Sequence, residues 1–322
     1  MNRPMHRAEI LMTAPMLPIV SNSLERSFTV HHLWEHRDQA GFLAAAGPRI
    51  RGIATSTLYG RVDATLLHWL PRAEIISSFG VGYDNVDVTE AARRGIVVTN
   101  TPGVLDEEVA DLAVGLLIAT LRKIPQADRY LREGDWLTAP FPLSPTLRGR
   151  TIGIVGLGRI GKAIARRLDG FGVAISYHGR SRQADVTYDY YPTLIALAKA
   201  NDVLIVVTPG GANTKHLVNG QILKALGSTG VVINVSRGSV VDEQALIDAL
   251  RSGTILGAGL DVYEHEPHVP AELIAMDNVV LLPHIASASI RTRDAMGQLL
   301  VDNLVSWFAG EGPLTPVPET PR

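Results

Sequence analysis

The sequence predicts an α/β protein with parallel sheets and two domains, on the basis of three observations. Short apolar runs alternate with helix-like segments, which is typical of parallel strands joined by crossover helices. The later apolar runs are nearly continuous, as expected of strands that are covered on both faces. The chain also has 322 residues, which is long for a single core, so two domains are expected.

Five apolar runs and two helical patterns occupy the first third of the chain. The runs predicted to be strands are residues 10–13, 28–30, 50–54, 75–79 and 96–99. Helices are predicted over residues 37–46 and 86–94, and a loop over residues 80–83. Loops at the carboxyl ends of parallel strands are where such sheets bind ligands.

A breaker cluster at residues 100–103 marks the predicted domain boundary. It opens a long helical pattern over residues 106–132, which Pro125 is expected to kink or divide. A final helical pattern over residues 290–308 is expected to return to the first domain. We therefore predict one domain of residues 1–103 plus 290–322 and a dinucleotide-binding domain of residues 104–289.

A glycine-rich stretch predicts where a dinucleotide binds. Strand-like residues 151–155 are followed by Gly156, Gly158 and Gly161, then by a helical pattern and a second strand over residues 173–178. The first glycine permits a tight turn, the second leaves room for a pyrophosphate, and the third lets helix and strand pack closely. The phosphates are expected at the helix N-terminus, where unpaired N–H groups favour an anion.

The residues after the second strand indicate which dinucleotide is preferred. An NAD-binding chain usually carries an acidic residue about 20 residues beyond the glycines. Here that place holds Arg180, Ser181 and Arg182, and no carboxylate occurs between Asp169 and Asp185. Two arginines and a hydroxyl suit the 2′-phosphate of NADP, so NADP is the preferred cofactor and NAD a possible one. The alternative is an ordinary solvated basic turn.

The later strands are predicted over residues 203–207, 231–234, 255–260 and 279–282, and three polar residues follow the last three of them. Arg237 can hold the carboxylate of a 2-oxo acid through its planar fork of donors. His284 can deliver a proton to the carbonyl oxygen as hydride arrives, and Glu266 can orient the imidazolium. Together they predict reduction of a 2-oxo acid by hydride transfer.

Composition and charge argue against several other kinds of protein. Net charge is −2 without a dense basic block, which argues against a nucleic acid or an anionic membrane as partner. The chain has no cysteine, so disulfides and thiolate sites are excluded. The apolar run at residues 112–121 is too short to span a bilayer, and Pro15 and Pro18 interrupt the one segment that resembles a signal peptide. We therefore expect a cytoplasmic protein.

Residues 264–268 hold two histidines and two carboxylates but lack helical spacing, so no metal site is predicted.

The chain resembles the D-isomer-specific 2-hydroxy-acid dehydrogenases over nearly its whole length. Four motifs carry the resemblance, in order: residues 156–161 (GLGRIG), 234–238 (NVSRG), 260–267 (LDVYEHEP) and 282–287 (LPHIAS). Trp136 and residues 141–144 (FPLS) resemble the branch that reduces glyoxylate, hydroxypyruvate or hydroxyphenylpyruvate. Two positions depart from the usual pattern: Asp106 stands where Thr is frequent, and Ala286 where Gly is frequent.

The resemblance implies two Rossmann-like domains with the active site in the cleft between them, and a homodimer formed through the cofactor domains. It implies that Val81 and Gly82 bind the substrate carboxylate and that Asp261 holds the nicotinamide carboxamide. The other predicted cofactor-binding residues are Arg159, Ile160, Thr208, Pro209 and Thr214, and the other predicted substrate-binding residues are Leu58 and Ser287.

The function predicted from these residues is NADPH-dependent reduction of small 2-oxo acids, such as glyoxylate or hydroxypyruvate, to D-2-hydroxy acids. The alternative is a dinucleotide-sensing binding protein, like the corepressors that share the family's fold and triad. Steady turnover of a 2-oxo acid would favour the enzyme, and cofactor binding without turnover would favour the sensor.

Overall fold

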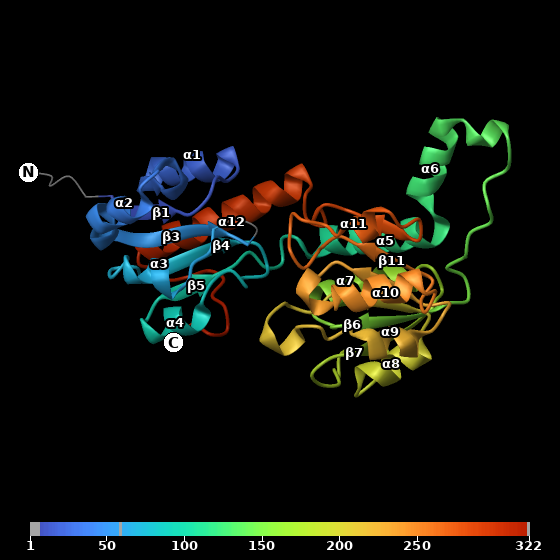
Figure 1. The fold of residues 1–322 in the computed structure, drawn as a ribbon. Coiled ribbons are helices and arrows are strands. Elements are labelled where there is room, and N and C mark those ends of the chain that lie inside the picture. Colours follow the sequence, from blue (N-terminus) through green and yellow to red (C-terminus); the bar gives the residue numbers. More distant parts are fainter. Residues whose placement is uncertain (1–6, 58–59, 321–322) are drawn as a thin grey trace, which may run out of the picture. The chain divides into compact units, whose positions relative to one another are not determined.

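The computed structural model describes residues 7–57 and 60–320. The chain divides into two compact units, residues 1–105 with 289–322 (unit 1) and residues 106–288 (unit 2). Each unit contains one parallel sheet, so the predicted α/β fold class with two parallel sheets is confirmed. Figure 1 shows the elements of each unit.

Unit 1 is built on a five-stranded parallel sheet in the order β2-β1-β3-β4-β5. The strands are β1 (Glu9–Met12), β2 (Thr29–His32), β3 (Ile50–Ser56), β4 (Ile75–Phe79) and β5 (Val97–Thr99). The helices are α1 (Pro18–Ser27), α2 (Gln39–Ala46), α3 (Ala64–His68), α4 (Val88–Arg93) and α12 (Ile290–Phe308). Three of these helices begin at an aspartate whose side chain accepts a backbone N–H, which explains why they start there: Asp38, Asp63 and Asp87.

Helix α12 comes from the end of the chain and lies against β4 of unit 1. The Ser77 hydroxyl of β4 donates to the Leu300 carbonyl over 3.1 Å. Asn303, also on α12, is fully buried and accepts the backbone N–H groups of Leu314 and Thr315. The two chain ends therefore build one unit together.

Unit 2 is built on a seven-stranded parallel sheet in the order β12-β11-β10-β9-β6-β7-β8. The strands are β6 (Thr151–Val155), β7 (Ala174–His178), β8 (Asp189–Tyr190), β9 (Val203–Val206), β10 (Val231–Asn234), β11 (Gly257–Leu260) and β12 (Val279–Leu281). The chain leaves β6 toward β7 and later returns to β9 on its other side. Ligands of such sheets bind beyond the carboxyl ends of the strands where this reversal occurs.

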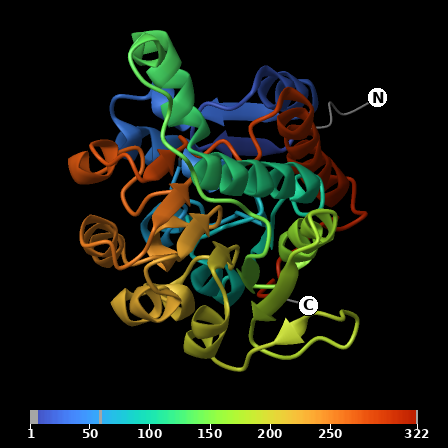
Figure 2. The ribbon, with the colours of Figure 1, turned by 90° about the vertical axis from the view of Figure 1, so that its right-hand side faces the viewer.

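Unit 2 contains seven α-helices among its described residues, and helices cover both faces of its sheet. They are α5 (Asp106–Arg122), α6 (Ile124–Glu133), α7 (Arg159–Asp169), α8 (Leu194–Ala200), α9 (Gly220–Leu226), α10 (Glu243–Arg251) and α11 (Ala271–Ile274). Figure 2 shows α5 and α7 on one side of the sheet and α8, α9 and α10 on the other. Strands β9 and β10 are buried at every position because of this double cover.

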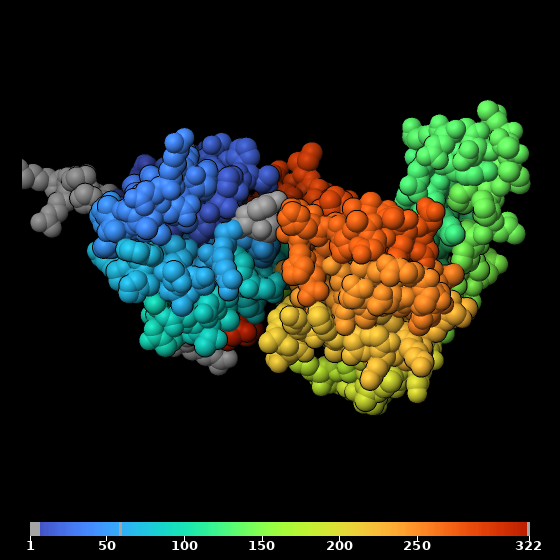
Figure 3. Space-filling view, in the orientation of Figure 1, coloured from blue at the N-terminus to red at the C-terminus, as the bar shows by residue number. Residues whose placement is uncertain are grey.

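The predicted division of the long helix near Pro125 is confirmed. Helix α5 ends at Arg122, Lys123 adopts a left-handed conformation with φ of 51°, and Pro125 lies in the first turn of α6. Proline is tolerated there because that N–H has no partner within the helix. Helix α6 buries none of its side chains, and Figure 3 shows the green segment around it standing away from the rest of unit 2.

Most predicted elements form within two residues of their expected bounds, but α1, α3 and β8 were not predicted, and no bounds were predicted for the helices α8 to α11 between the later strands. Helix α3 has five residues and β8 has two, which is too short for a periodic pattern to appear. Helix α1 begins at Pro18, inside an apolar run that continues from β1. No helix in the described part of the chain is long and apolar enough to cross a membrane.

Candidate active site

The glycine loop after β6 has the geometry that a dinucleotide requires. Gly156 has φ of +100°, and a Cβ there would lie 2.9 Å from the Thr208 side chain. A Cβ on Gly161 would overlap the carbonyl oxygen of Gly156, so only glycine lets α7 pack this close to the loop. A Cβ on Gly158 would meet nothing within 4 Å, which leaves bare backbone facing open space.

The start of α7 also suits a phosphate group. Gly158 is the N-cap and supplies no side-chain hydrogen bond, and the first turn has no acidic residue. The N–H groups at this end, including those of Arg159 and Ile160, precede the first complete turn of the helix. Nearby, the Thr208 hydroxyl is buried and has no hydrogen-bond partner in the described structure. A bound dinucleotide could satisfy it, so these residues fit the cofactor.

Two further cofactor-site predictions lie in the loop after β9. The Thr214 hydroxyl donates to the carbonyl of Pro209 over 2.8 Å, which closes this loop on itself. In the glycine motif itself, Arg159 Nε lies 3.2 Å from the Asp106 carboxylate at the start of α5. The unusual Asp106 is therefore the ion-pair partner of an arginine in the glycine motif.

Arg180, Ser181 and Arg182 lie together in an exposed turn directly after β7. Strands β6 and β7 are neighbours, so this turn and the glycine loop emerge from the same edge of the sheet. The structure records no ion pair for either arginine with another described residue. Two uncompensated cations at this place are suited to an anionic group.

Arg237 follows β10 in a loop that Asn234 organises. The Asn234 side chain accepts the N–H and the hydroxyl of Ser236 and donates to the carbonyl of Arg237 over 3.0 Å. The Arg237 guanidinium donates to the Ser236 carbonyl over 2.8 Å. A Cβ on Gly238 would overlap the Tyr263 backbone, so this loop lies directly on the one that carries Glu266.

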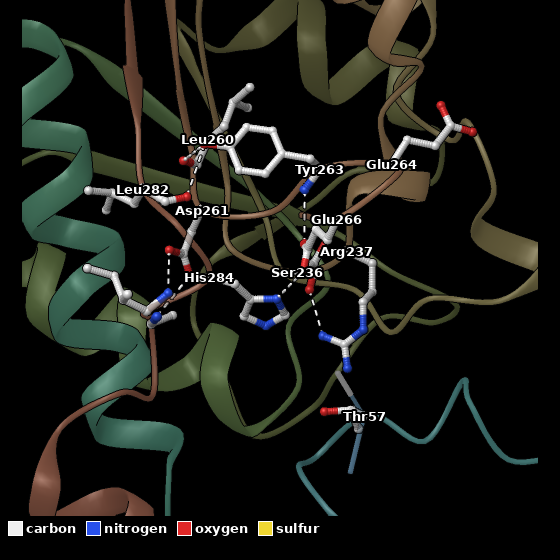
Figure 4. A network of polar contacts seen from close by, with 12 residues as sticks. Thr57, Ser236, Arg237, Leu260, Asp261, Tyr263, Glu264, Glu266, Leu282 and His284 are labelled. Carbon is white, nitrogen blue, oxygen red and sulfur yellow. Dashed lines mark hydrogen bonds and ion pairs between the residues drawn. The ribbon is translucent and has the colours of Figure 1, made fainter. Parts of the chain in front are cut away.

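Glu266 and His284 are in direct contact, as Figure 4 shows. His284 Nδ1 lies 2.7 Å from Glu266 Oε2, and Glu266 Oε1 accepts the Tyr263 N–H over 3.0 Å. Their side chains keep 22% and 25% of their exposure, so both remain open to a small molecule. With Nδ1 held by the carboxylate, Nε2 is the nitrogen of His284 that is left to face a ligand.

The charge of Glu266 is set by opposing effects. Burial raises the pKa of Glu266, whereas the hydrogen bond and the charge of His284 lower it. The Tyr263 N–H and the positive charge of Arg237 act in the same direction, so the net pKa lies below its ordinary value. The carboxylate is therefore ionised at neutral pH.

Asp261 holds His284 in a backbone conformation that non-glycine residues rarely adopt. His284 has φ of 54°, in the left-handed region, which costs about 1–2 kcal/mol. The Asp261 carbonyl accepts the His284 N–H over 2.8 Å. Its two carboxylate oxygens accept the N–H groups of Ile285 and Ala286 over 2.7 and 2.8 Å. This aspartate is fully buried, and burial raises its pKa despite those two hydrogen bonds.

This positioning task of Asp261 was not predicted, and its contact with a nicotinamide carboxamide stays a prediction. The organising role of Asn234 was also missed. Both residues lie in sequence motifs that were recognised, but their partners are backbone groups, which leave no trace in a sequence pattern.

The predicted substrate loop lies in unit 1 after β4. Asn100 donates to the Val81 carbonyl over 2.7 Å, and Thr101 bonds to Gly80 through its hydroxyl and its N–H. These bonds hold the loop at Gly80 and Val81, directly before Gly82. Ser287 is half-buried in the loop after His284, and Leu58 lies outside the described residues. Within the described ranges, no group of three or more His, Asp or Glu side chains is arranged to hold a metal ion.

Comparison with known proteins identifies the family. Residues 114–286 match the D-isomer specific 2-hydroxyacid dehydrogenase, NAD binding domain. Glyoxylate/hydroxypyruvate reductase A of Arabidopsis thaliana is 46% identical over 96% of this chain and 98% of its own length. Hydroxyphenylpyruvate reductase of Plectranthus scutellarioides is 44% identical with the same coverage.

A solved structure of the same class of reductase is also similar to this chain. It is the NADPH-dependent glyoxylate/hydroxypyruvate reductase of Sinorhizobium meliloti in complex with NADP and malonate. It is 53% identical, covers 98% of each chain and superposes with a TM-score of 0.93. The chain therefore belongs to the D-isomer-specific 2-hydroxyacid dehydrogenase family of enzymes.

Proposed function

We propose that this enzyme uses NADPH to reduce small 2-oxo acids, such as glyoxylate or hydroxypyruvate, to D-2-hydroxy acids. The observation that carries the proposal is the contact between His284 and Glu266. Both residues lie beyond the carboxyl ends of β12 and β11, next to β10, which Arg237 follows. The names of the relatives support this substrate class, since two of the three are glyoxylate/hydroxypyruvate reductases.

The three side chains have distinct tasks in this proposal. A reduced nicotinamide cofactor, when bound, supplies the hydride. Arg237 binds the substrate carboxylate through its paired donors and polarises the neighbouring carbonyl. His284 gives the proton on Nε2 to the carbonyl oxygen, because Nδ1 is engaged by Glu266 over 2.7 Å. Glu266 stays ionised because its pKa is lowered, so it stabilises the positive charge that His284 must carry before it gives up the proton.

The proposed roles of the remaining residues follow the same division. Unit 2 would be the dinucleotide-binding domain and unit 1 the substrate domain, with Val81 and Gly82 offering N–H groups to the carboxylate. The glycine loop and Thr208 would bind the pyrophosphate and its neighbouring ribose, and Asp261 the carboxamide.

The preference for NADPH rests on Arg180 and Arg182. Both are exposed beside the glycine loop, and a 2′-phosphate carries roughly −1.5 to −2 charge at neutral pH. The Sinorhizobium meliloti relative, which is NADPH-dependent by name, supports this choice.

The test is steady-state kinetics on a panel of 2-oxo acids with both cofactors. We expect higher kcat/KM with NADPH than with NADH. Replacing Arg180 and Arg182 by Ala should lower kcat/KM with NADPH, by the equivalent of roughly 1.5–3 kcal/mol per lost charged hydrogen bond. The kcat/KM with NADH should stay nearly unchanged. Arg251→Ala, an exposed arginine on α10, is the control. Equal losses with both cofactors would contradict the assignment, and tight NADPH binding without turnover of any acid would favour a sensor.

We also infer that the enzyme is a cytoplasmic homodimer. The α6 segment supports the dimer, because it exposes five large apolar side chains: Ile124, Leu131, Trp136, Leu137 and Leu143. Large apolar side chains that are exposed within one short segment are typical of a protein interface. Light scattering of the purified chain should give twice the monomer mass, and a monomer would refute this part of the proposal.

A further inference from the structure

The turn that carries the exposed arginines is held at three points. At its start, the Tyr190 hydroxyl donates to the Gly179 carbonyl over 3.3 Å. Beyond its end, Lys162 Nζ on α7 lies 2.6 Å from the Asp185 carboxylate. Between them, the Gln183 N–H donates to the hydroxyl of Tyr177, a fully buried residue of β7, over 2.7 Å.

Gln183 also makes a second hydrogen bond, which connects the turn to the glycine loop. Its side-chain Nε2 donates to the Leu157 carbonyl over 2.6 Å. Leu157 stands between Gly156 and Gly158 in the glycine loop and is only 2% exposed. Gln183 follows Arg182 directly, so one residue ties the arginine turn both to the core and to the loop that faces the pyrophosphate.

This connection has a physical consequence for cofactor choice. Arginine side chains lose much rotational freedom when they bind, and an exposed turn adds backbone freedom of its own. A turn that is already fixed relative to the glycine loop avoids part of this loss. It also sets the separation at which two phosphate groups of one molecule can be bound simultaneously.

We propose that Gln183 is a positioning residue for NADPH specificity, which holds the arginine turn against the glycine loop through the Leu157 carbonyl. The inference rests on the proposed function, because it gives Arg180 and Arg182 the task of binding the 2′-phosphate. NADH lacks this phosphate, so Gln183 should matter much less for its use.

The first test compares Gln183→Ala with wild type. This variant loses the bond to Leu157 but keeps the backbone N–H that reaches Tyr177, so the fold should be retained. We expect kcat/KM with NADPH to fall by roughly three- to tenfold, the effect of one net hydrogen bond, mainly through KM. The kcat/KM with NADH should change by less than about twofold. Gln244→Ala is the matched control, because Gln244 is exposed and its amide donates to Asp248 on its own helix.

The second test asks whether Gln183 acts through the arginines. We expect Gln183→Ala to have almost no further effect on NADPH use when Arg180 and Arg182 are already Ala. A general structural role would instead lower NADPH and NADH use alike and would add to the arginine effect. Either of these results would overturn the inference.

The two proposals can fail separately. If the arginine variant uses NADPH as well as wild type does, the proposed phosphate site itself is wrong. If the arginine variant loses NADPH use but Gln183→Ala behaves like Gln244→Ala, only the role of Gln183 is wrong.

Discussion

Adding a methyl group to the glycine loop should separate cofactor binding from stability. Gly158→Ala places a Cβ where no protein atom lies within 4 Å, and Gly161→Ala places one against the Gly156 carbonyl oxygen. The first variant should therefore lose NADPH affinity without losing stability. The second should lose stability in the absence of any cofactor.

The expected magnitudes follow from the local geometry. Gly158 has φ of −78° and ψ of −160°, which alanine also adopts, so the unfolding free energy of Gly158→Ala should differ from wild type by less than about 1 kcal/mol. Gly161→Ala forces a backbone shift worth about 1–3 kcal/mol, partly offset by about 1 kcal/mol of helix propensity. In the complex, the methyl group that Gly158→Ala adds would keep a phosphate away from the loop N–H groups. Weakening one charge-assisted bond costs about 1.5–3 kcal/mol, or at least tenfold in Kd.

Calorimetric unfolding without cofactor and fluorescence titration with NADPH measure the two effects. A loss of 1 kcal/mol should lower Tm by about 2–4 °C. Gly115→Ala is the control, because Gly115 lies on the exposed face of α5 and its Cβ would also meet nothing within 4 Å. It should raise stability slightly and leave NADPH affinity unchanged. If Gly158→Ala binds NADPH as tightly as wild type, the phosphate does not approach the loop at Gly158.

Three further predictions concern His284, Glu266 and Asp261, whose roles are proposed above. His284→Ala should lower turnover by about 100- to 10,000-fold while NADPH titration shows nearly normal affinity, and unchanged turnover would remove His284 from the mechanism. Glu266 has a pKa below its ordinary value of 4.5, so its ionised form stabilises the fold above that value and the contribution disappears as pH falls through the lowered pKa. The difference in unfolding free energy between wild type and Glu266→Gln should accordingly be constant near neutral pH and vanish in acid. A difference that grows in acid would show that folding raises the pKa of Glu266 instead of lowering it. Asp261→Asn replaces one acceptor by a donor against the Ile285 or Ala286 N–H, so kcat should fall at least tenfold, and unchanged kinetics would show that the His284 backbone does not need this anchor.

Local patterns in the sequence predicted most of the fold because they arise from neighbours in the chain. The helix over residues 290–308 was predicted at the bounds it has, since its apolar positions recur with helical spacing. The glycine motif spans only six residues, and its three glycines have the geometry that their spacing requires. Helix α3 and strand β8 were missed because such short elements depend on packing rather than on their own periodicity.

In the candidate site, too, some features were predictable from the sequence and others were not. Arg237, Glu266 and His284 were found because each follows an apolar run, and the order β12-β11-β10 puts those strand ends side by side. The contact between His284 and Glu266 depends on how two loops fold over that edge. The left-handed backbone of His284 and the three bonds that Asp261 makes to its loop could not be inferred, because residue types do not record which backbone groups they bind.

The sequence by itself determined the α/β class, the family, the glycine loop and the presence of an arginine, a glutamate and a histidine after three successive strands. These depend on spacing over a few residues and on recognisable motifs. Only the tertiary structure decided which nitrogen of His284 stays available, which carboxylate anchors its backbone, and that Gln183 joins the arginine turn to the glycine loop. Those features are hydrogen bonds between residues 18 to 26 positions apart. Such bonds form only when packing of the sheet and helices brings the loops together, and a linear pattern does not contain that information.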